Sequence, residues 1–292
     1  EEHYHAAIHS KIKNRRIVFL IQKSSNWEEN KKHNTVISIR KDLNQFLIYL
    51  NEHDIIDFNK LDELLIKEYF TKLKTEEISA STFNRRLSSI KKFYKYLVDK
   101  GLKEKGSEIL IESEKNDEKK IEYLSPEEIN LVRATMQGEN FNILRDRLMF
   151  ELLYSSGMTV AELLSLGEVN FNLEKREIYI LKNKLSKTMY FSETCKEFYI
   201  KFLNSKKEKF KEDYNPNIIF TNNSNERLTD RSVRRLINKY GEMANLNKEI
   251  SPYTLRHSFC IYMLKNGMPK EYLARLLDLK VVGLLDVYEG LC

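Results

Sequence analysis

Two segments of the sequence place cationic side chains along one side of a predicted helix. The first carries Arg85, Arg86, Lys91, Lys92 and Lys95 opposite an apolar stripe, and the second, at 229–243, carries Arg231, Arg234 and Arg235. On its own, such a face is most often simply solvated. It can also neutralise the phosphates of a nucleic acid backbone, and this is the chemistry that these residue types first indicate.

The distribution of charge favours the phosphate-binding interpretation of the first segment. Residues 1–111 contain 21 Lys and Arg against 16 Asp and Glu, a net of +5, and the whole chain of 292 residues has a net charge of +6. A mildly basic balance permits an anionic partner but does not prove one.

Composition disfavours several other classes of protein. No apolar run approaches the roughly 20 residues that span a membrane, and no export signal opens the chain. No two of the three cysteines, Cys195, Cys260 and Cys292, are spaced to hold zinc, and their number fits a reducing compartment. With only 9 Gly and 4 Pro, we expect a cytoplasmic, mainly α-helical protein without a metal site.

The apolar residues of the first third recur at helical spacing. They predict helices over 34–53, from about 61 to 73, and from Ser79–Ser81 onward. The third helix has Ser81 or Thr82 as its expected N-cap and Gly101 at its C-terminal cap.

The polar stretch 112–120 cannot be buried and separates two periodic regions, which is typical of a linker. We therefore predict a basic helix or tail at 1–24, a helical domain at 25–111 and a second domain at 121–292.

The second domain is predicted to be helical around a small sheet. Its first helix opens on Ser125-Pro126-Glu127-Glu128, with a serine cap and proline at the first helical position. Alternating apolar residues over 169–192 predict short strands, to which Ile218–Phe220 would add one more. The remaining predicted helices cover 141–156, 160–166, 229–243, 252–266 and 269–278.

Four motifs then occur in an order that resembles the tyrosine recombinases, the group of phage integrases and Xer proteins. In chain order they are the N-terminal stretches 35–46 and 81–88, taken together, then Arg145-Asp146-Arg147 with Leu152–Leu164, then Thr254-Leu255-Arg256-His257-Ser258-Phe259, and last Asp286-Val287-Tyr288. Any one motif is a weak match, whereas four in order are a strong one. The resemblance implies a SAM-like helical core-binding domain followed by an α-rich catalytic domain with a small antiparallel β-sheet.

The resemblance also implies an activity, site-specific DNA recombination through a 3′-phosphotyrosyl intermediate and without a cofactor. Tyr288 corresponds to the nucleophile. Arg256 corresponds to the second of two arginines that neutralise the phosphate, and Glu162 to the acid that supports the first. His257 matches the histidine that commonly follows the second arginine.

The family also uses a lysine on the hairpin of its sheet to protonate the leaving oxygen. Lys182 and Lys184 both match it, because the register is ambiguous by two residues. Exposed hairpin lysines are equally often only solvated, so the sequence leaves the role of both open.

Three positions depart from the family pattern. Thr159 stands in place of the first arginine, Tyr253 in place of a histidine or lysine, and Leu279 in place of the last histidine. Losing one preorganised donor to a developing anion typically slows a reaction by about 10²–10³. Arg147 lies twelve residues before Thr159 and is too far along a helix to replace that arginine. We therefore expect recombination that is weak or depends on a partner.

A second hypothesis is a catalytically inactive DNA-binding relative that acts as an accessory or regulatory protein. Both hypotheses predict double-stranded DNA as the partner, with a homotetramer on DNA or a second recombinase beside it, and neither involves a membrane. Covalent attachment to DNA separates them. A helical protein without a nucleic acid role is the third interpretation.

Overall fold

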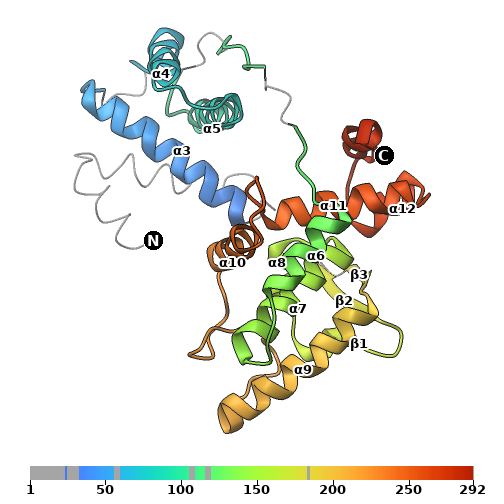
Figure 1. The fold of residues 1–292 in the computed structure, drawn as a ribbon. Helices are drawn as coiled ribbons and strands as arrows, with labels where there is room; N and C mark the ends of the chain where they lie inside the picture. The colour runs from blue at the N-terminus through green and yellow to red at the C-terminus, as the bar shows by residue number, and fades with distance from the viewer. Residues whose placement is uncertain are drawn as a thin grey trace. The chain divides into compact units, whose positions relative to one another are not determined.

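The structure is a computed structural model that describes Ser24 and residues 33–55, 60–104, 109–115, 120–182 and 185–291. The chain separates into two compact units, Glu1–Lys119 and Lys120–Cys292 (Figure 1). Apart from Ser24, the helix or tail predicted at 1–24 lies outside the described residues. Within the described ranges, none of the helices has the length and apolarity needed to cross a membrane.

In the described part of the first unit, three helices pack around an aromatic-rich core. They are α3 (His33–Glu52), α4 (Glu63–Thr75) and α5 (Ala80–Asp99). Phe46, Phe70 and Phe93 are almost completely buried between them. These helices agree with the predicted ones, except that the N-cap of α5 is Ser79, whose side chain accepts from the backbone N–H of Thr82. The prediction of Ser81 or Thr82 was wrong because either position lies inside the first turn.

The second unit contains all the strands of the described residues and more of the helices. The helices are α6 (Pro126–Thr135), α7 (Phe141–Ser156), α8 (Val160–Ser165), α9 (Glu193–Phe210), α10 (Asp230–Met243), α11 (Pro252–Lys265) and α12 (Lys270–Leu276). Short 3₁₀ segments are η2 (Glu168–Asn170), η3 (Lys211–Asp213) and η4 (Val282–Leu291). Helix α7 is buried along most of its length and contacts α8, α9, α11 and the sheet (Figure 1).

The start of α6 and the end of α7 lie where the sequence predicted them. Ser125 and Glu128 form a reciprocal capping box at the start of α6, behind Pro126. Gly157 ends α7 with φ of 62°, a left-handed conformation that glycine adopts without steric cost. A Cβ at this position would lie 2.3 Å from the ring of Phe259. Glycine therefore allows α11 to approach the end of α7 closely.

The sheet has three antiparallel strands in the order β1 (Phe171–Asn172), β2 (Glu177–Lys182) and β3 (Leu185–Tyr190). This confirms the strands predicted within 169–192. The extra strand predicted at Ile218–Phe220 was wrong. Ile219 and Phe220 are buried, but the N–H of Ile219 donates to the carbonyl of Leu166, and the described residues nearby form only an isolated bridge between Thr221 and Arg227.

Helix α9 and segment η4 were not predicted. Ser192 caps α9, and its buried face contains Cys195, Tyr199 and Phe202. The same face also contains Lys206, whose ammonium donates to the carbonyls of Asn215 and Ile218. A buried lysine inside the apolar stripe interrupts the periodicity that would have indicated the helix.

Candidate active site and nucleic-acid interface

Helix α11 positions the arginine and the histidine of the second motif. A capping box between Ser251 and Thr254 starts the helix. The guanidinium of Arg256 donates to the carbonyl of Gly157 at 2.5 Å and to that of Leu277 at 3.4 Å. These carbonyls belong to the C-terminal caps of α7 and α12. Arg256 is thus fixed at the ends of two helices, where the negative ends of their dipoles favour a cation.

Tyr288 lies on η4 with its hydroxyl 2.7 Å from Nδ1 of His257. Only 7% of the tyrosine is exposed, and it packs in a cluster with Phe259, Cys260 and Leu285. Burial, with a contribution from Cys260, raises the pKa of Tyr288 above its usual value. The phenol is therefore neutral at pH 7 and needs a base before it can act as a nucleophile.

His257 has the properties of that base. Burial and the neighbouring charge of Arg256 lower its pKa below the usual value. The imidazole is therefore neutral at pH 7, and Nδ1 can accept the proton of the tyrosine hydroxyl. The structure brings together Tyr288, Arg256 and His257, three of the residues that the sequence singled out.

Thr159 is the N-cap of α8. Its hydroxyl accepts from the N–H of Glu162, while Oε2 of Glu162 accepts from the N–H and the hydroxyl of Thr159 at 2.8 and 2.9 Å. Both polar groups of Thr159 are therefore engaged in a capping box. The residue acts as a helix cap where the family pattern has an arginine.

The other oxygen of Glu162 accepts from the ammonium of Lys187 at 2.7 Å. Both side chains are 9% exposed. Burial raises the pKa of Glu162, but its contacts with Lys187 and Thr159 outweigh burial and hold the pKa below its usual value. The acid is therefore ionised and has a lysine as its cationic partner.

Sequence reasoning missed Lys187. The residue pairs with Ile180 in the β2–β3 ladder and lies two positions before Met189, and both of these apolar residues are buried. The alternation of a strand places residues two apart on the same face. This period of two was the available signal, because a lysine at a core-facing position must have a partner.

The hairpin lysines remain predictions. The backbone of Lys182 ends β2 and pairs with Leu185. The side chain of Lys182 and the whole of Lys184 lie outside the described residues.

Tyr253 and Leu279 are the other two positions that differ from the family pattern, and they lie in different environments. Tyr253 is 57% exposed, and the guanidinium of Arg234 lies 5.4 Å from the centre of its ring. Leu279 packs partly buried against the cluster around Tyr288, and its N–H donates to the carbonyl of Ala274. Asp278 precedes it with φ of 54°, so the pair closes α12 as a Schellman motif in which an apolar residue is favoured at the Leu279 position.

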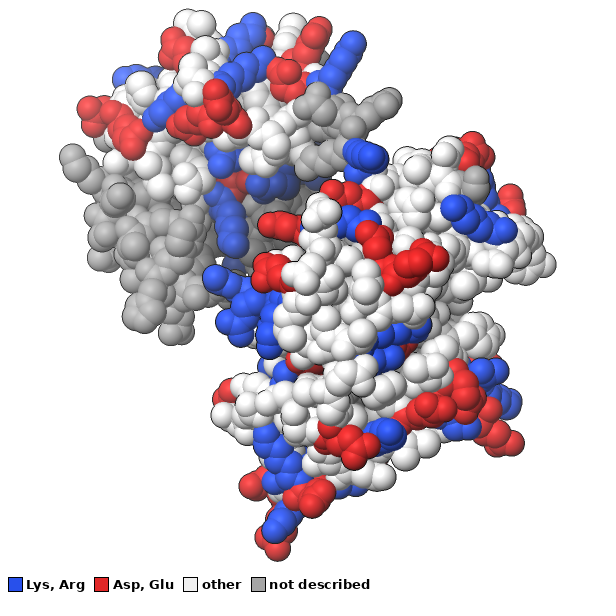
Figure 2. All heavy atoms as spheres, in the orientation of Figure 1, with Lys and Arg blue, Asp and Glu red and all other residues white. Residues whose placement is uncertain are grey.

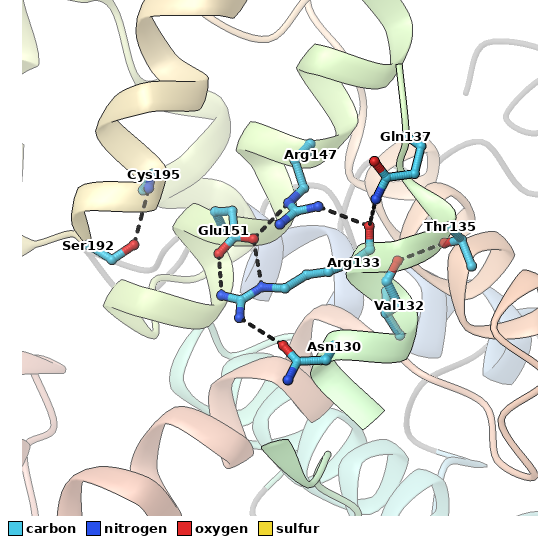
Figure 3. Close-up of polar contacts among 9 residues, drawn as sticks. All are labelled: Asn130, Val132, Arg133, Thr135, Gln137, Arg147, Glu151, Ser192 and Cys195. Atoms are coloured by element: carbon cyan, nitrogen blue, oxygen red, sulfur yellow. Dashed lines mark hydrogen bonds and ion pairs between the residues drawn. The ribbon is translucent and has the colours of Figure 1, made fainter. Parts of the chain in front are cut away.

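The arginines of α7 are occupied elsewhere. Arg147 donates to Oε1 of Glu151 at 2.7 Å and to the carbonyl of Arg133 at 2.9 Å, and Arg133 itself forms two bonds to Glu151 (Figure 3). Glu151 is completely buried. Arg145 is held by Asp146 and by the carbonyl of Thr221. Arg147 therefore does not replace the missing arginine, in agreement with the estimate from its sequence position.

Some basic residues of α5 are bound within the protein, and others are exposed to solvent. Arg85 donates at 2.5 Å to Asp42, which is only 2% exposed and also accepts from Ser89. Lys91 donates to the carbonyl of Ile111, Arg86 is half-buried, and Lys92 and Lys95 are exposed. A groove of about 400 Å³ between α3 and α5 is lined by Thr35, Ser38, Ile39, Arg85, Ser88, Ser89 and Lys92.

The arginines of α10 line a second groove, of about 580 Å³. Its lining consists of Glu122, Arg231, Arg234, Arg235, Asn238, Glu249, Ile250, Ser251 and Thr254. Lys and Arg side chains gather over α10 in Figure 2, whereas charges of both signs are mixed around α9. Arg234 is paired with Asp230 at 2.5 Å.

Among the residues that the structure describes, no group of three His, Cys, Asp or Glu side chains is placed to hold a metal ion. Guanidinium groups in general can donate forked hydrogen bonds to the oxygens of a phosphate.

Comparison with known proteins defines the class. Residues 122–289 match the phage integrase family, and residues 27–101 match the phage integrase N-terminal SAM-like domain. The chain belongs to the phage integrase family, the tyrosine recombinases.

Individual relatives are consistent with that assignment. Tyrosine recombinase XerD of Staphylococcus haemolyticus (strain JCSC1435) is 30% identical over 241 residues, which are 82% of either chain. XerD of Staphylococcus aureus (strain N315) is 28% identical over the same share. Among solved structures, XerH bound to difH in a pre-cleavage complex has a TM-score of 0.71 at 18% identity, covering 96% of this chain and 86% of that one. Tn1549 integrase in complex with circular intermediate DNA has a TM-score of 0.70 at 18% identity, covering 93% and 94%. These structures show the shared fold.

Proposed function

We propose that this chain binds duplex DNA and exchanges strands through a covalent bond between Tyr288 and a 3′-phosphate. The observation that carries the proposal is the 2.7 Å contact between the Tyr288 hydroxyl and Nδ1 of His257, beside Arg256. The solved relatives that share the fold include XerH and Tn1549 integrase in complex with DNA, which supports DNA as the partner.

The first step follows from this arrangement. The oxygen of Tyr288 attacks phosphorus as its proton passes to His257, and the bond from phosphorus to the 5′ oxygen breaks. Arg256 stabilises the added negative charge on the non-bridging oxygens. The leaving oxygen requires a proton, for which Lys182 or Lys184 is the expected source. A 5′-hydroxyl of a second strand then reverses the step, so no cofactor is consumed.

Nonspecific affinity would come from the basic residues of each unit. We expect phosphate contacts from Arg86, Lys91, Lys92 and Lys95 on α5, and from Arg231 and Arg235 on α10. Tyr253 lies beside Arg234 near the second groove, so its hydroxyl is a further candidate contact. Assembly as a tetramer on two DNA sites, or with a second recombinase, remains part of the proposal.

Two observations favour the alternative of an inactive DNA-binding relative. Thr159 is engaged in capping α8, and Leu279 packs against apolar side chains. Two positions that bear donors in the family pattern therefore supply none to a phosphate here.

The test uses duplex DNA made from sequences that flank the gene, with a nick close to the cleavage site. Cleavage then releases a short fragment that carries the 5′-hydroxyl, so the reaction cannot reverse and the protein–DNA adduct accumulates. A protein–DNA adduct on a denaturing gel that is absent with Tyr288→Phe supports the recombinase. An adduct that appears only with Thr159→Arg, while the unaltered chain binds the same DNA, supports the inactive relative.

A further inference from the structure

Among the residues that the structure describes, Arg256 is the one arginine whose contacts place it beside the Tyr288–His257 pair. Arg256 is next to His257, whereas the two arginines of α7, Arg145 and Arg147, bind Asp146, Glu151 and backbone carbonyls. Thr159 is uncharged and engaged by Glu162. A reaction that builds negative charge on phosphate gains most from more than one preorganised cation.

Lys187 and Thr159 donate hydrogen bonds to the two different oxygens of the Glu162 carboxylate. Oε2 of Glu162 accepts from Thr159 at 2.8 and 2.9 Å, and Oε1 accepts from Lys187 at 2.7 Å. The ammonium is therefore fixed beside the residue that stands in place of an arginine, and it arrives from β3 rather than from α8.

The same turn of chain also holds Arg256. Its guanidinium donates to the carbonyl of Gly157 at 2.5 Å, two residues before Thr159. The segment from Gly157 to Glu162 thus contacts both cations, one through a backbone carbonyl and one through a carboxylate.

Stability alone does not account for a lysine at this position. Lys187 pairs with Ile180 on the buried face of the sheet. Replacing a buried ion pair by apolar side chains of similar volume is often neutral or stabilising, because both ions lose their hydration. A buried charged pair on the same segment that binds Arg256 is a candidate for a functional role.

We propose that Lys187, held by Glu162, is the second cationic group of the active site and stabilises the charge on the scissile phosphate where Thr159 cannot. The proposal rests on the function proposed above. No proton or electron moves through Lys187 in this role. The tyrosine oxygen bonds to phosphorus, the bond to the 5′ oxygen breaks, and the ammonium keeps its charge throughout.

The experiment measures the rate of adduct formation with the full chain on nicked duplex DNA. Lys187→Met is expected to lower the rate by about 10²–10³, while Lys187→Arg retains most of it because the cation remains. Lys175→Met, at an exposed turn between β1 and β2, is the matched control and keeps the original rate.

A second substrate separates electrostatics from misfolding. A methylphosphonate at the scissile position removes one negative charge from the phosphate, so the deficit of Lys187→Met is expected to shrink strongly on this DNA. An equal deficit on both substrates would overturn the proposal, and so would an unchanged rate of Lys187→Met on normal DNA. If the unaltered chain forms no Tyr288-dependent adduct, the proposed function fails first, which is a separate result.

Discussion

The hydroxyl of Tyr288 lies 2.7 Å from Nδ1 of His257, although the two residues are 31 positions apart in the sequence. The tyrosine comes from η4 and the histidine from α11. Both are half-buried or buried, and burial shifts their pKa values in opposite directions, up for Tyr288 and down for His257. The pair is consequently neutral at pH 7 and ready for transfer of one proton.

This pair predicts the pH dependence of adduct formation. His257 has a pKa below its usual 6.5 and Tyr288 one above its usual 10.0, so the rate should be flat around pH 7. It should fall only below about pH 6.5, as the imidazole becomes protonated. His257→Gln should lower the rate at neutral pH by about 10²–10⁴ and remove the decrease in rate at acid pH. An unaltered decrease at acid pH in this variant would show that another group titrates.

The same pKa shift affects stability. Because the unfolded chain binds a proton on His257 more readily than the folded chain, the contribution of this residue to the free energy of unfolding is lost as the pH falls through the window below 6.5. Urea unfolding at pH 7 and pH 5 should show a smaller pH-dependent loss for His257→Gln than for the unaltered chain. Equal losses would contradict this assignment.

The capping role of Thr159 predicts a loss of stability on its removal. Thr159→Ala removes the side chain that accepts from the N–H of Glu162 and should lower the free energy of unfolding by about 1 kcal/mol. Thr159→Ser keeps the hydroxyl and should remain within a few tenths of the original value. The measurement is urea unfolding followed by circular dichroism. A serine variant as unstable as the alanine variant would argue that the methyl group matters rather than the cap.

The buried network at Glu151 predicts a larger effect. Glu151 accepts bonds from Arg133 and Arg147 and has no exposed surface (Figure 3). Glu151→Gln leaves two guanidinium groups with a neutral partner and should destabilise the second unit by about 3–5 kcal/mol, as measured by thermal unfolding. Glu193→Gln, at a side chain that is 59% exposed, is the control and should change little.

Arg85 and Lys92 line the same groove but should behave differently. Arg85→Met leaves the buried carboxylate of Asp42 without its arginine, so it should cost about 1–3 kcal/mol of stability as well as DNA affinity. Lys92→Met should leave stability unchanged. It should reduce the slope of log binding constant against log salt concentration by about 1, the amount expected for one lost phosphate contact. Fluorescence anisotropy across a salt series measures the slope. Equal stability losses in the two variants would contradict the distinction.

The sequence predicted the helices whose apolar stripes are uninterrupted, including α5 and α10, and it located the starts and ends marked by Ser125 and Gly157. It did not predict α9, because Lys206 occupies its buried face, or the N-cap at Ser79. Residues 1–23, Lys184 and the side chain of Lys182 lie outside the described part of the structure, so their predicted roles are unchanged.

The sequence by itself determined the family, the order of the motifs, and the residue types at Tyr288, Arg256 and His257. Only the tertiary structure decided that Thr159 caps α8 and that Glu162 pairs with Lys187. The reason is physical. Apolar periodicity and capping signals act within a few residues of chain, whereas an ion pair between positions 25 apart depends on how β3 packs against α8. The sequence shows which charged residues are present, and tertiary packing decides which of them form ion pairs.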